Sequence, residues 1–344
     1  MHRSGIIYKT RIGITKTLNN MFTVLMPFAT SYNNIMVPKH IVIDIKHKNF
    51  QKLAYKREQA LERGTLLSNS DDYVSAKIRH NGKTVNVDIR LKGDIIDHLK
   101  GDKWSYRIKV KGNSSLFGMK KFSIQHPGTR NYLHEWIYHQ ALKDNDLFSL
   151  RYDFINVILN GNNLGIYALE EHFDKRLVEY NKRREGPIIK FDEDLLFLDN
   201  YYADWIDGHQ SDYLRSFYSS NVDVFQKKKS FSDPETKRQF IQARNLLESF
   251  RMGELSTHQV FDINTLSKFF VISEIFGAVH SAHRWRNIRF YYNPITSLLE
   301  PIGFDGMAGH QAKPIIEEKY LYDSYGNFYD MLFKDTLFVK EYVY

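Results

Sequence analysis

The sequence predicts an α+β protein in two lobes, with a sheet-rich first lobe and a mostly helical second lobe. Short alternating segments of β-branched and aromatic residues, separated by turn residues, run from Ile41 to about residue 172. Longer segments with the periodicity and the end signals of helices follow them. We therefore expect a poorly specified leader at 1–40, an antiparallel sheet with one main helix at 41–172, and a helical lobe at 173–344.

Composition narrows the class of protein. Hydrophobic residues make up 42% and charged residues 26% of the 344 residues, which excludes a disordered or coiled-coil chain. The chain has no cysteine, so a disulfide scaffold, a cysteine-ligated zinc site and a thiol nucleophile are excluded.

The chain is basic, with 48 Lys and Arg against 40 Asp and Glu, and its net charge of +8 favours an anionic partner. The basic residues are spread along the sequence and form no nucleic-acid-binding motif, so we expect no nucleic-acid partner. No apolar run is long enough for a transmembrane segment. Residues 21–30 are apolar but short and contain Pro27, so they give no clear signal peptide, and a degraded export segment stays open.

The first lobe shows two hairpins. The strongest pairs 74–80 with 83–92 through Asn81-Gly82, because both residues tolerate the positive φ of a type I′ turn. The second pairs 152–159 with 164–169 through Asn160-Gly161. Between them we expect strands at 104–111 and 119–125. A helix fits 130–143, with its apolar residues on one face: Leu133, Trp136, Ile137 and Ala141.

The second lobe is dominated by helices. One fits 174–184 and is broken by Gly186-Pro187. Another begins at Ser232 or Asp233, has Pro234 in its first turn and ends before Gly253. A third begins at the Asp262 cap and is almost wholly apolar to about residue 279, so we expect it to be the central buried helix.

A polar loop from His280 to Asn287 follows this helix. Next come a hairpin at 288–302 and the segment Gly303-Phe304-Asp305-Gly306. The order of buried helix, loop ending in Asn, hairpin and Gly-flanked Asp is that of the second lobe of protein kinases, where the Asn and the Asp hold Mg²⁺. Carboxylate and amide oxygens suit a hard divalent cation. We therefore predict that Asp305 and Asn287 bind a metal ion beside a nucleotide.

The catalytic loop lacks its usual base. The kinase loop has a His seven residues before the Asn, and His280 fits that register, but the position of the catalytic Asp is taken by Ala282. His283 is a substitute base, because imidazole titrates near neutral pH. The alternative is that His283 is a structural residue beside Trp285.

The first lobe offers a phosphate site. Arg90 and Lys92 share one face of a strand, as do Arg107 and Lys109 on the next strand. Two cationic pairs on adjacent strands suit the oxygens of a di- or triphosphate, and the alternative is a solvated, charged sheet face.

Three acidic residues complete this prediction. We expect Glu135, in the following helix, to pair with one of the strand cations. Glu170 and Glu171 close the second hairpin, where the backbone of a kinase hinge meets adenine.

Several of these segments resemble the spore coat protein H (CotH) kinase family. The resemblance covers roughly residues 74–310 and rests on Arg90-Leu91-Lys92-Gly93, Ser105-Tyr106-Arg107-Ile108-Lys109, Leu159-Asn160-Gly161, Gly165-Ile166-Tyr167-Ala168-Leu169-Glu170, Asn287 and Ile302-Gly303-Phe304-Asp305.

This resemblance implies an atypical protein kinase fold that uses ATP with Mg²⁺ or Mn²⁺ and phosphorylates Ser or Thr hydroxyls of a protein partner. It also implies a spore-surface or extracytoplasmic location. The sequence departs from the family pattern in two places: Gly306-Met307 follows Asp305 where a second Asp is usual, and no Asp precedes Asn287 at position 282.

Two other functions stay open at this point. Ala282 favours a non-catalytic pseudokinase that serves as a nucleotide-binding or protein-binding scaffold. His280, His283 and His310, joined by Asp305, suggest a metal-dependent hydrolase, since two His three residues apart can reach one ion. Few residues follow Asp305 compared with a usual kinase second lobe, so we also expect the chain to be truncated at its C-terminus.

Overall fold

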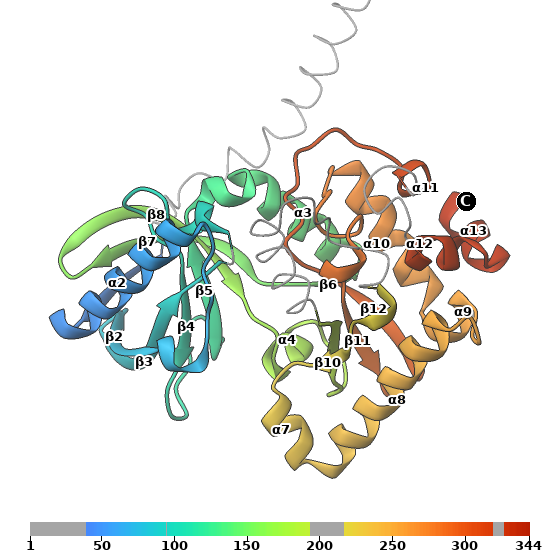
Figure 1. Ribbon diagram of the computed structural model, residues 1–344, viewed down its shortest axis with the longest axis horizontal. Helices are drawn as coiled ribbons and strands as arrows, with labels where there is room; N and C mark the ends of the chain where they lie inside the picture. Colours follow the sequence, from blue (N-terminus) through green and yellow to red (C-terminus); the bar gives the residue numbers. More distant parts are fainter. Residues whose placement is uncertain (1–38, 94, 193–216, 319–326) are drawn as a thin grey trace, which may run out of the picture. The chain divides into compact units, whose positions relative to one another are not determined.

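The first half of the chain contains a closed barrel of seven strands (Figure 1). The structure, a computed structural model, describes residues 39–93, 95–192, 217–318 and 327–344. The barrel order is β1-β2-β3-β4-β5-β8-β7. Its strands are β1 (His40–Ile45), β2 (Val74–His80), β3 (Lys83–Leu91), β4 (Tyr106–Val110), β5 (Lys121–Gln125), β7 (Tyr152–Leu159) and β8 (Asn162–Glu171).

The barrel strands follow the alternation of apolar and polar residues in the sequence. Along β1, β2, β3 and β4 every second residue is buried in one apolar cluster, which includes Ile43, Ile78, Ile89 and Ile108. Asn81 and Asn160 have positive φ at the two hairpin turns, so both predicted hairpins are confirmed. The expectation of a purely antiparallel sheet is wrong, because β1 pairs in parallel with β7 and closes the barrel.

A second helix accompanies the barrel and was not predicted. Helix α2 (His47–Arg63) packs against β2, β3 and the short 3-10 helix η2 (Ile96–Leu99). Only Leu53 and Ala60 are buried along α2, so its apolar stripe is too narrow to stand out in the sequence.

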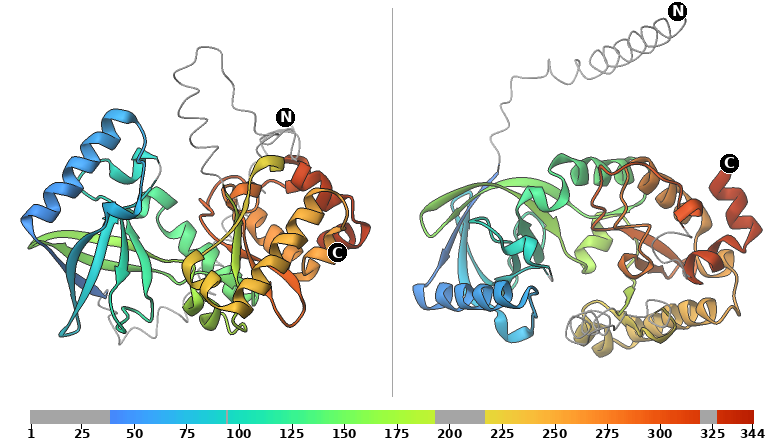
Figure 2. Two further views of the ribbon diagram at one scale, coloured as in Figure 1. Left: turned by 60° about the horizontal axis from the view of Figure 1, so that its bottom comes forward. Right: turned by 45° about the horizontal axis from the view of Figure 1, so that its top comes forward.

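The second half is built on a five-stranded sheet with the order β10-β9-β11-β12-β6. Helix α8 (Pro234–Arg251) lies against β9, β10 and β11 (Figure 2), and α10 (Ile263–Ile275) packs against β12. Together they enclose a large aromatic core. The strands are β6 (Phe148–Ser149), β9 (Ile188–Phe191), β10 (Val222–Val224), β11 (Arg289–Asn293) and β12 (Leu298–Gly303).

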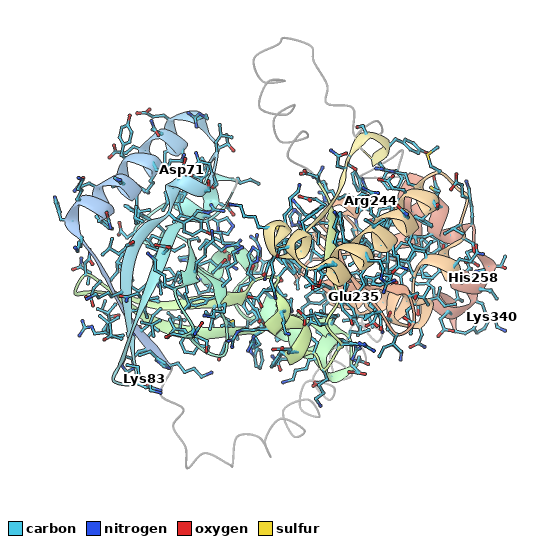
Figure 3. The ribbon with its side chains drawn as sticks, turned by 90° about the horizontal axis from the view of Figure 1, so that it is seen from below. Asp71, Lys83, Glu235, Arg244, His258 and Lys340 are labelled. Atoms are coloured by element: carbon cyan, nitrogen blue, oxygen red, sulfur yellow. The ribbon has the colours of Figure 1, made fainter. Side chains whose placement is uncertain are left out.

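The predicted helix starts of this half are confirmed. The Asp233 carboxylate accepts a hydrogen bond from the Thr236 amide at 2.8 Å and caps α8, whose second residue, Glu235, is labelled in Figure 3. Asp262 caps α10 through the Thr265 amide at 3.0 Å. The other helices are α4 (Lys175–Tyr180), α7 (Lys227–Ser232), α9 (Thr257–Val260), α11 (Ile315–Glu318), α12 (Asn327–Phe333) and α13 (Thr336–Val343).

Helix α3 (Leu133–Asp144) joins the two halves, because it contacts β7 of the barrel as well as β6 and α10 (Figure 1). The predicted buried face of this helix is wrong. Leu133, Trp136 and Ile137 are exposed, whereas the buried residues are Glu135, Tyr138, His139 and Leu142. The reason is that the Glu135 carboxylate binds amides of the loop after β12, as described below, and the Tyr138 hydroxyl forms hydrogen bonds with the Ser273 and Ser281 hydroxyls at 2.9 and 3.2 Å.

Residues His40–Tyr344 form one compact unit. The division at residues 172 and 173 therefore stays a prediction. The predicted leader lies almost wholly outside the described residues. Within the described ranges, no helix combines the length and the apolar character that crossing a membrane requires.

Candidate functional site

The loop after β12 carries Asp305 in an unusual backbone conformation. Asp305 and Met307 both have positive φ, at 51° and 47°, in the region that most residues avoid. The Glu135 carboxylate holds this loop by accepting hydrogen bonds from the amides of Gly306 at 2.8 Å and Ala308 at 3.5 Å. The Asn131 side chain donates to the Ala308 carbonyl at 2.8 Å. The segment around α3 thus fixes the position of Asp305.

The Asp305 side chain is 11% exposed and has two partners. It forms an ion pair with the Arg130 guanidinium, and one carboxylate oxygen, Oδ2, lies 3.0 Å from His280 Nδ1. Burial opposes the charged carboxylate, but Arg130 and His280 outweigh burial and hold the pKa of Asp305 well below its usual range. Asp305 is therefore a charged, buried carboxylate at neutral pH.

Asn287 lies next to Asp305, as the kinase-like order predicts. Its side-chain amide donates to the His280 carbonyl at 2.7 Å and approaches the backbone carbonyl of Asp305 at 3.5 Å. The contact between the two predicted metal ligands therefore runs through the backbone of Asp305 and not through its carboxylate.

These residues do not fit a metal ion as they lie. A divalent cation needs the lone pairs of carboxylate oxygens, but the carboxylate of Asp305 already faces a guanidinium and an imidazole. Among the described residues, no group of three or more His, Cys, Asp or Glu side chains could hold a metal ion.

The histidine cluster expected for a hydrolase is not formed. His283 Nε2 lies 3.3 Å from the Lys313 carbonyl, His280 contacts Asp305, and His310 is exposed at the surface. This correction removes the structural basis for the hydrolase. His283 is buried, with 6% of its surface exposed, which agrees with its structural interpretation better than with a role as base.

Ala282 occupies the position of the kinase base and is fully buried. It belongs to the apolar core of the second half, and its carbonyl accepts a hydrogen bond from the Tyr329 hydroxyl at 2.7 Å. Its methyl group packs in that core, so no acidic group takes the place of the base there.

Three of the four predicted cations, Arg90, Arg107 and Lys109, share the outer face of the barrel. The register places Arg90 opposite Arg107, and Lys109 opposite Lys121 on β5. These residues alternate with the interior residues Ile89, Ile108 and Phe122, so they point outward. We call Arg90, Arg107, Lys109 and Lys121 the cationic face.

Lys121 was not predicted, and other cations of the face lie beside it. Burial and the neighbouring cations Arg107 and Lys109 lower the pKa of Lys121 to about 8. Arg90 and Lys109 lie over the ring of Tyr73, at 5.4 and 3.7 Å from its centroid.

Lys92 belongs to a buried network beside this face. Its ammonium donates to Glu170 Oε2 at 2.8 Å and to Gln125 Oε1 at 2.6 Å, and Gln125 Nε2 donates to the same Glu170 oxygen at 3.0 Å. Burial opposes the charge of Glu170, but the Lys92 ammonium lowers the pKa of Glu170 below its usual value. The expected pairing of Glu135 with a strand cation is therefore wrong, because Glu170 pairs with Lys92 and Glu135 binds the Asp305 loop.

A basic cavity of about 570 Å³ adjoins the cationic face. Ligand sites commonly measure roughly 300–1,000 Å³, so the cavity is large enough for a nucleotide. Basic side chains outnumber acidic ones in its lining, which consists of Lys109, Val110, Lys120, Lys121, Asp174, Lys175, Arg176, Glu179, Gln226 and Lys229.

The cationic face and the Asp305 loop are electrostatically connected. Arg107 acts on both Lys121 and Lys92, and Lys92 in turn acts on Asp305. The two sets of residues that the sequence predicted as one site therefore lie close enough to interact.

The sequence that forms this site matches a known protein family. The model of the family described as "CotH kinase protein" matches residues 89–305, well over half of the chain. The chain belongs to the CotH kinase family. No curated protein matches it.

The CotH match begins in β3 and ends at Asp305. It therefore includes the whole cationic face, the Lys92–Glu170 pair and the Asn287 loop. The resemblance stated from the sequence is confirmed.

Sequence reasoning missed Arg130 and the role of His280 in this CotH site. Arg130 ends a 3-10 helix, η3 (Pro127–Arg130), just before α3, and no motif pointed to it. Lys121, by contrast, could have been predicted. It lies two residues before Ser123 and therefore on the same face of β5, and Ser123 pairs with Arg107 and Glu170 on the neighbouring strands.

Proposed function

We propose that this CotH-family protein binds the polyphosphate of ATP on the cationic face of the barrel. The observation that carries the proposal is the register of Arg90, Arg107, Lys109 and Lys121 on adjacent outer positions beside a basic cavity. Guanidinium groups bind phosphate oxygens bidentately, and ammonium groups add point charges. The adenine ring of ATP would contact the segment after Glu171, where the chain leaves the barrel.

The activity expected at family level is kinase-like. The finer activity that the family resemblance implies is transfer of the γ-phosphoryl group of ATP to a Ser or Thr hydroxyl of a protein partner, with Mg²⁺ or Mn²⁺, and it is the first of two candidate functions. Charge neutralisation by the cationic face would support such a transfer. The kinase-like two-lobed arrangement and the spore-surface or extracytoplasmic location belong to this proposal.

A second function is a scaffold that binds nucleotide without transfer. Two observations favour it: Ala282 is buried where the base would stand, and Arg130 engages the carboxylate that would hold the metal. The geometry supports this pseudokinase function better than it supports transfer.

One experiment separates the two functions. ATP binding is measured by calorimetry, and transfer is measured with γ-labelled ATP, Mg²⁺ or Mn²⁺ and an acidic, Ser-rich peptide. We expect ATP binding without transfer. Transfer that is lost in Asp305→Asn would make the protein a kinase, and absence of ATP binding would overturn the proposal.

A matched pair of variants tests the location of the site. Lys109→Met with Lys121→Met removes two charges of the cationic face, and we expect ATP affinity to fall about tenfold or more. Lys83→Met removes an exposed charge at the β2–β3 hairpin, labelled in Figure 3, and should leave the affinity unchanged. Equal effects of the two changes would place the nucleotide elsewhere.

A further inference from the structure

Arg130 is built into the same segment that fixes the Asp305 loop. Arg130 is 9% exposed, and its Nη1 donates to the Thr129 carbonyl at 2.6 Å. The next residue, Asn131, holds the Ala308 carbonyl, and Glu135 holds the Gly306 amide. Arg130 and Asp305 are therefore positioned by contacts on both sides of their ion pair, and their association does not depend on the ion pair alone.

The charges around Arg130 are arranged for a cation. Burial opposes the guanidinium charge, but Asp305, Glu170 and Glu135 outweigh burial and raise the pKa of Arg130. A divalent ion at the Asp305 carboxylate would lie beside this fixed positive charge and be repelled by it. It would also have to displace Arg130 or His280 from the carboxylate.

We propose that the guanidinium of Arg130 takes the cation position beside Asp305, so that this chain closes the family metal site with its own side chain. Asp305 then acts as a positioning residue for the loop between β12 and Ala308. A corollary, which rests on the proposed function, is that ATP binds to the cationic face without needing a divalent metal.

Mn²⁺ alone provides the first test, because electron paramagnetic resonance counts bound Mn²⁺ without any nucleotide or activity. We expect no specific Mn²⁺ site in the wild-type protein. In Arg130→Met we expect one site to appear, and in Arg130→Met with Asp305→Asn we expect it to disappear. Arg130→Lys keeps a positive charge and should gain no site.

Arg151→Met is the matched control, because Arg151 also pairs with a buried carboxylate, that of Glu171, which is not part of the Asp305 loop. It should gain no Mn²⁺ site. A wild-type Mn²⁺ site that is lost in Asp305→Asn overturns the proposal even if Arg130→Met fails to fold. A folded Arg130→Met variant without a new site also overturns it.

Calorimetry of ATP binding in EDTA and in Mg²⁺ tests the corollary. We expect the two affinities to agree within about threefold. Tightening by Mg²⁺ of about tenfold or more that is lost in Asp305→Asn would overturn the corollary and the closed site together. If ATP binds under neither condition, the proposed function fails, whereas the Mn²⁺ result still decides the role of Arg130.

Discussion

The cationic face of the barrel and the loop after β12 differ in whether their charged side chains have partners of opposite charge. On the barrel, Arg90 and Lys109 lie over the Tyr73 ring rather than on a carboxylate, and Lys121 sits among other cations. In the loop, the carboxylate of Asp305 meets both a guanidinium and an imidazole. The cationic face, which would bind phosphates, therefore keeps its positive charge. In the loop, which would bind a metal ion, the negative charge of Asp305 is neutralised by the protein's own side chains.

This difference explains why membership of a kinase family does not settle activity here. Anion binding needs only an excess of positive charge on a surface, which the barrel register supplies. Phosphoryl transfer also needs a metal and a positioned base. Four substitutions test this contrast between the two regions, beginning with the one that should destabilise the protein most.

The Lys92–Glu170 pair should show the largest effect. Glu170→Leu leaves the Lys92 ammonium buried with only Gln125 as an uncharged partner, and we expect the free energy of unfolding to fall by about 3–5 kcal/mol. Urea denaturation measures this change. Adding Lys92→Met should recover most of the loss, since removing both charges also removes the desolvation penalty. A double variant as unstable as the single one would contradict this account.

Asp305→Asn tests the loop after β12, where Arg130 and His280 neutralise the carboxylate. It leaves the buried Arg130 without its carboxylate, and we expect a loss of about 2–4 kcal/mol at pH 7. The pKa of Asp305 is lower in the folded chain than in the unfolded one, so the charged carboxylate stabilises the fold above the unfolded pKa of about 3.9. That stabilisation is lost as the pH falls below it.

The stability difference between the wild-type and Asp305→Asn proteins should therefore stay constant above about pH 5 and narrow as the pH falls from there toward about pH 2. Denaturation curves across this range measure it. A difference that stays constant would mean that Asp305 does not titrate with folding, and that its role is one of shape alone.

Glu135→Gln tests how the loop is held. The carboxylate accepts from two backbone amides, whereas the amide offers only one acceptor, so we expect a loss of about 1–2 kcal/mol. Hydrogen exchange should show lower protection of the Gly306 amide. Glu179→Gln, at an exposed position of α4, is the control and should change neither quantity.

These residues show which parts of the molecule the sequence can predict. The Asn-Gly turns and the Asp caps act within a few residues, so the hairpins, α8 and α10 were predicted from local rules. Closure of the barrel depends on the parallel pairing of β1 with β7, which no local pattern records.

In the candidate site, too, the sequence revealed residues that are close along the chain and missed those whose partners are distant. Asp305 and Asn287 were found because a loop and a hairpin keep them close along the chain. Arg130 was missed because its partner lies far away in sequence. The buried face of α3 was misassigned because Glu135 is buried by the amides it binds, and hydrophobic periodicity does not report such a contact.

Lys121 gives the smallest and most local test of the cationic face. With its pKa lowered to about 8, this lysine loses its proton over a range where an ordinary lysine stays charged. ATP binding would favour the protonated form, so affinity should fall about threefold to tenfold between pH 7 and pH 9, as binding then requires proton uptake. Lys121→Arg keeps its charge throughout and should flatten this dependence in calorimetric titrations. If the variant and the wild-type protein lose affinity in parallel, another group titrates, and the polyphosphate does not contact Lys121.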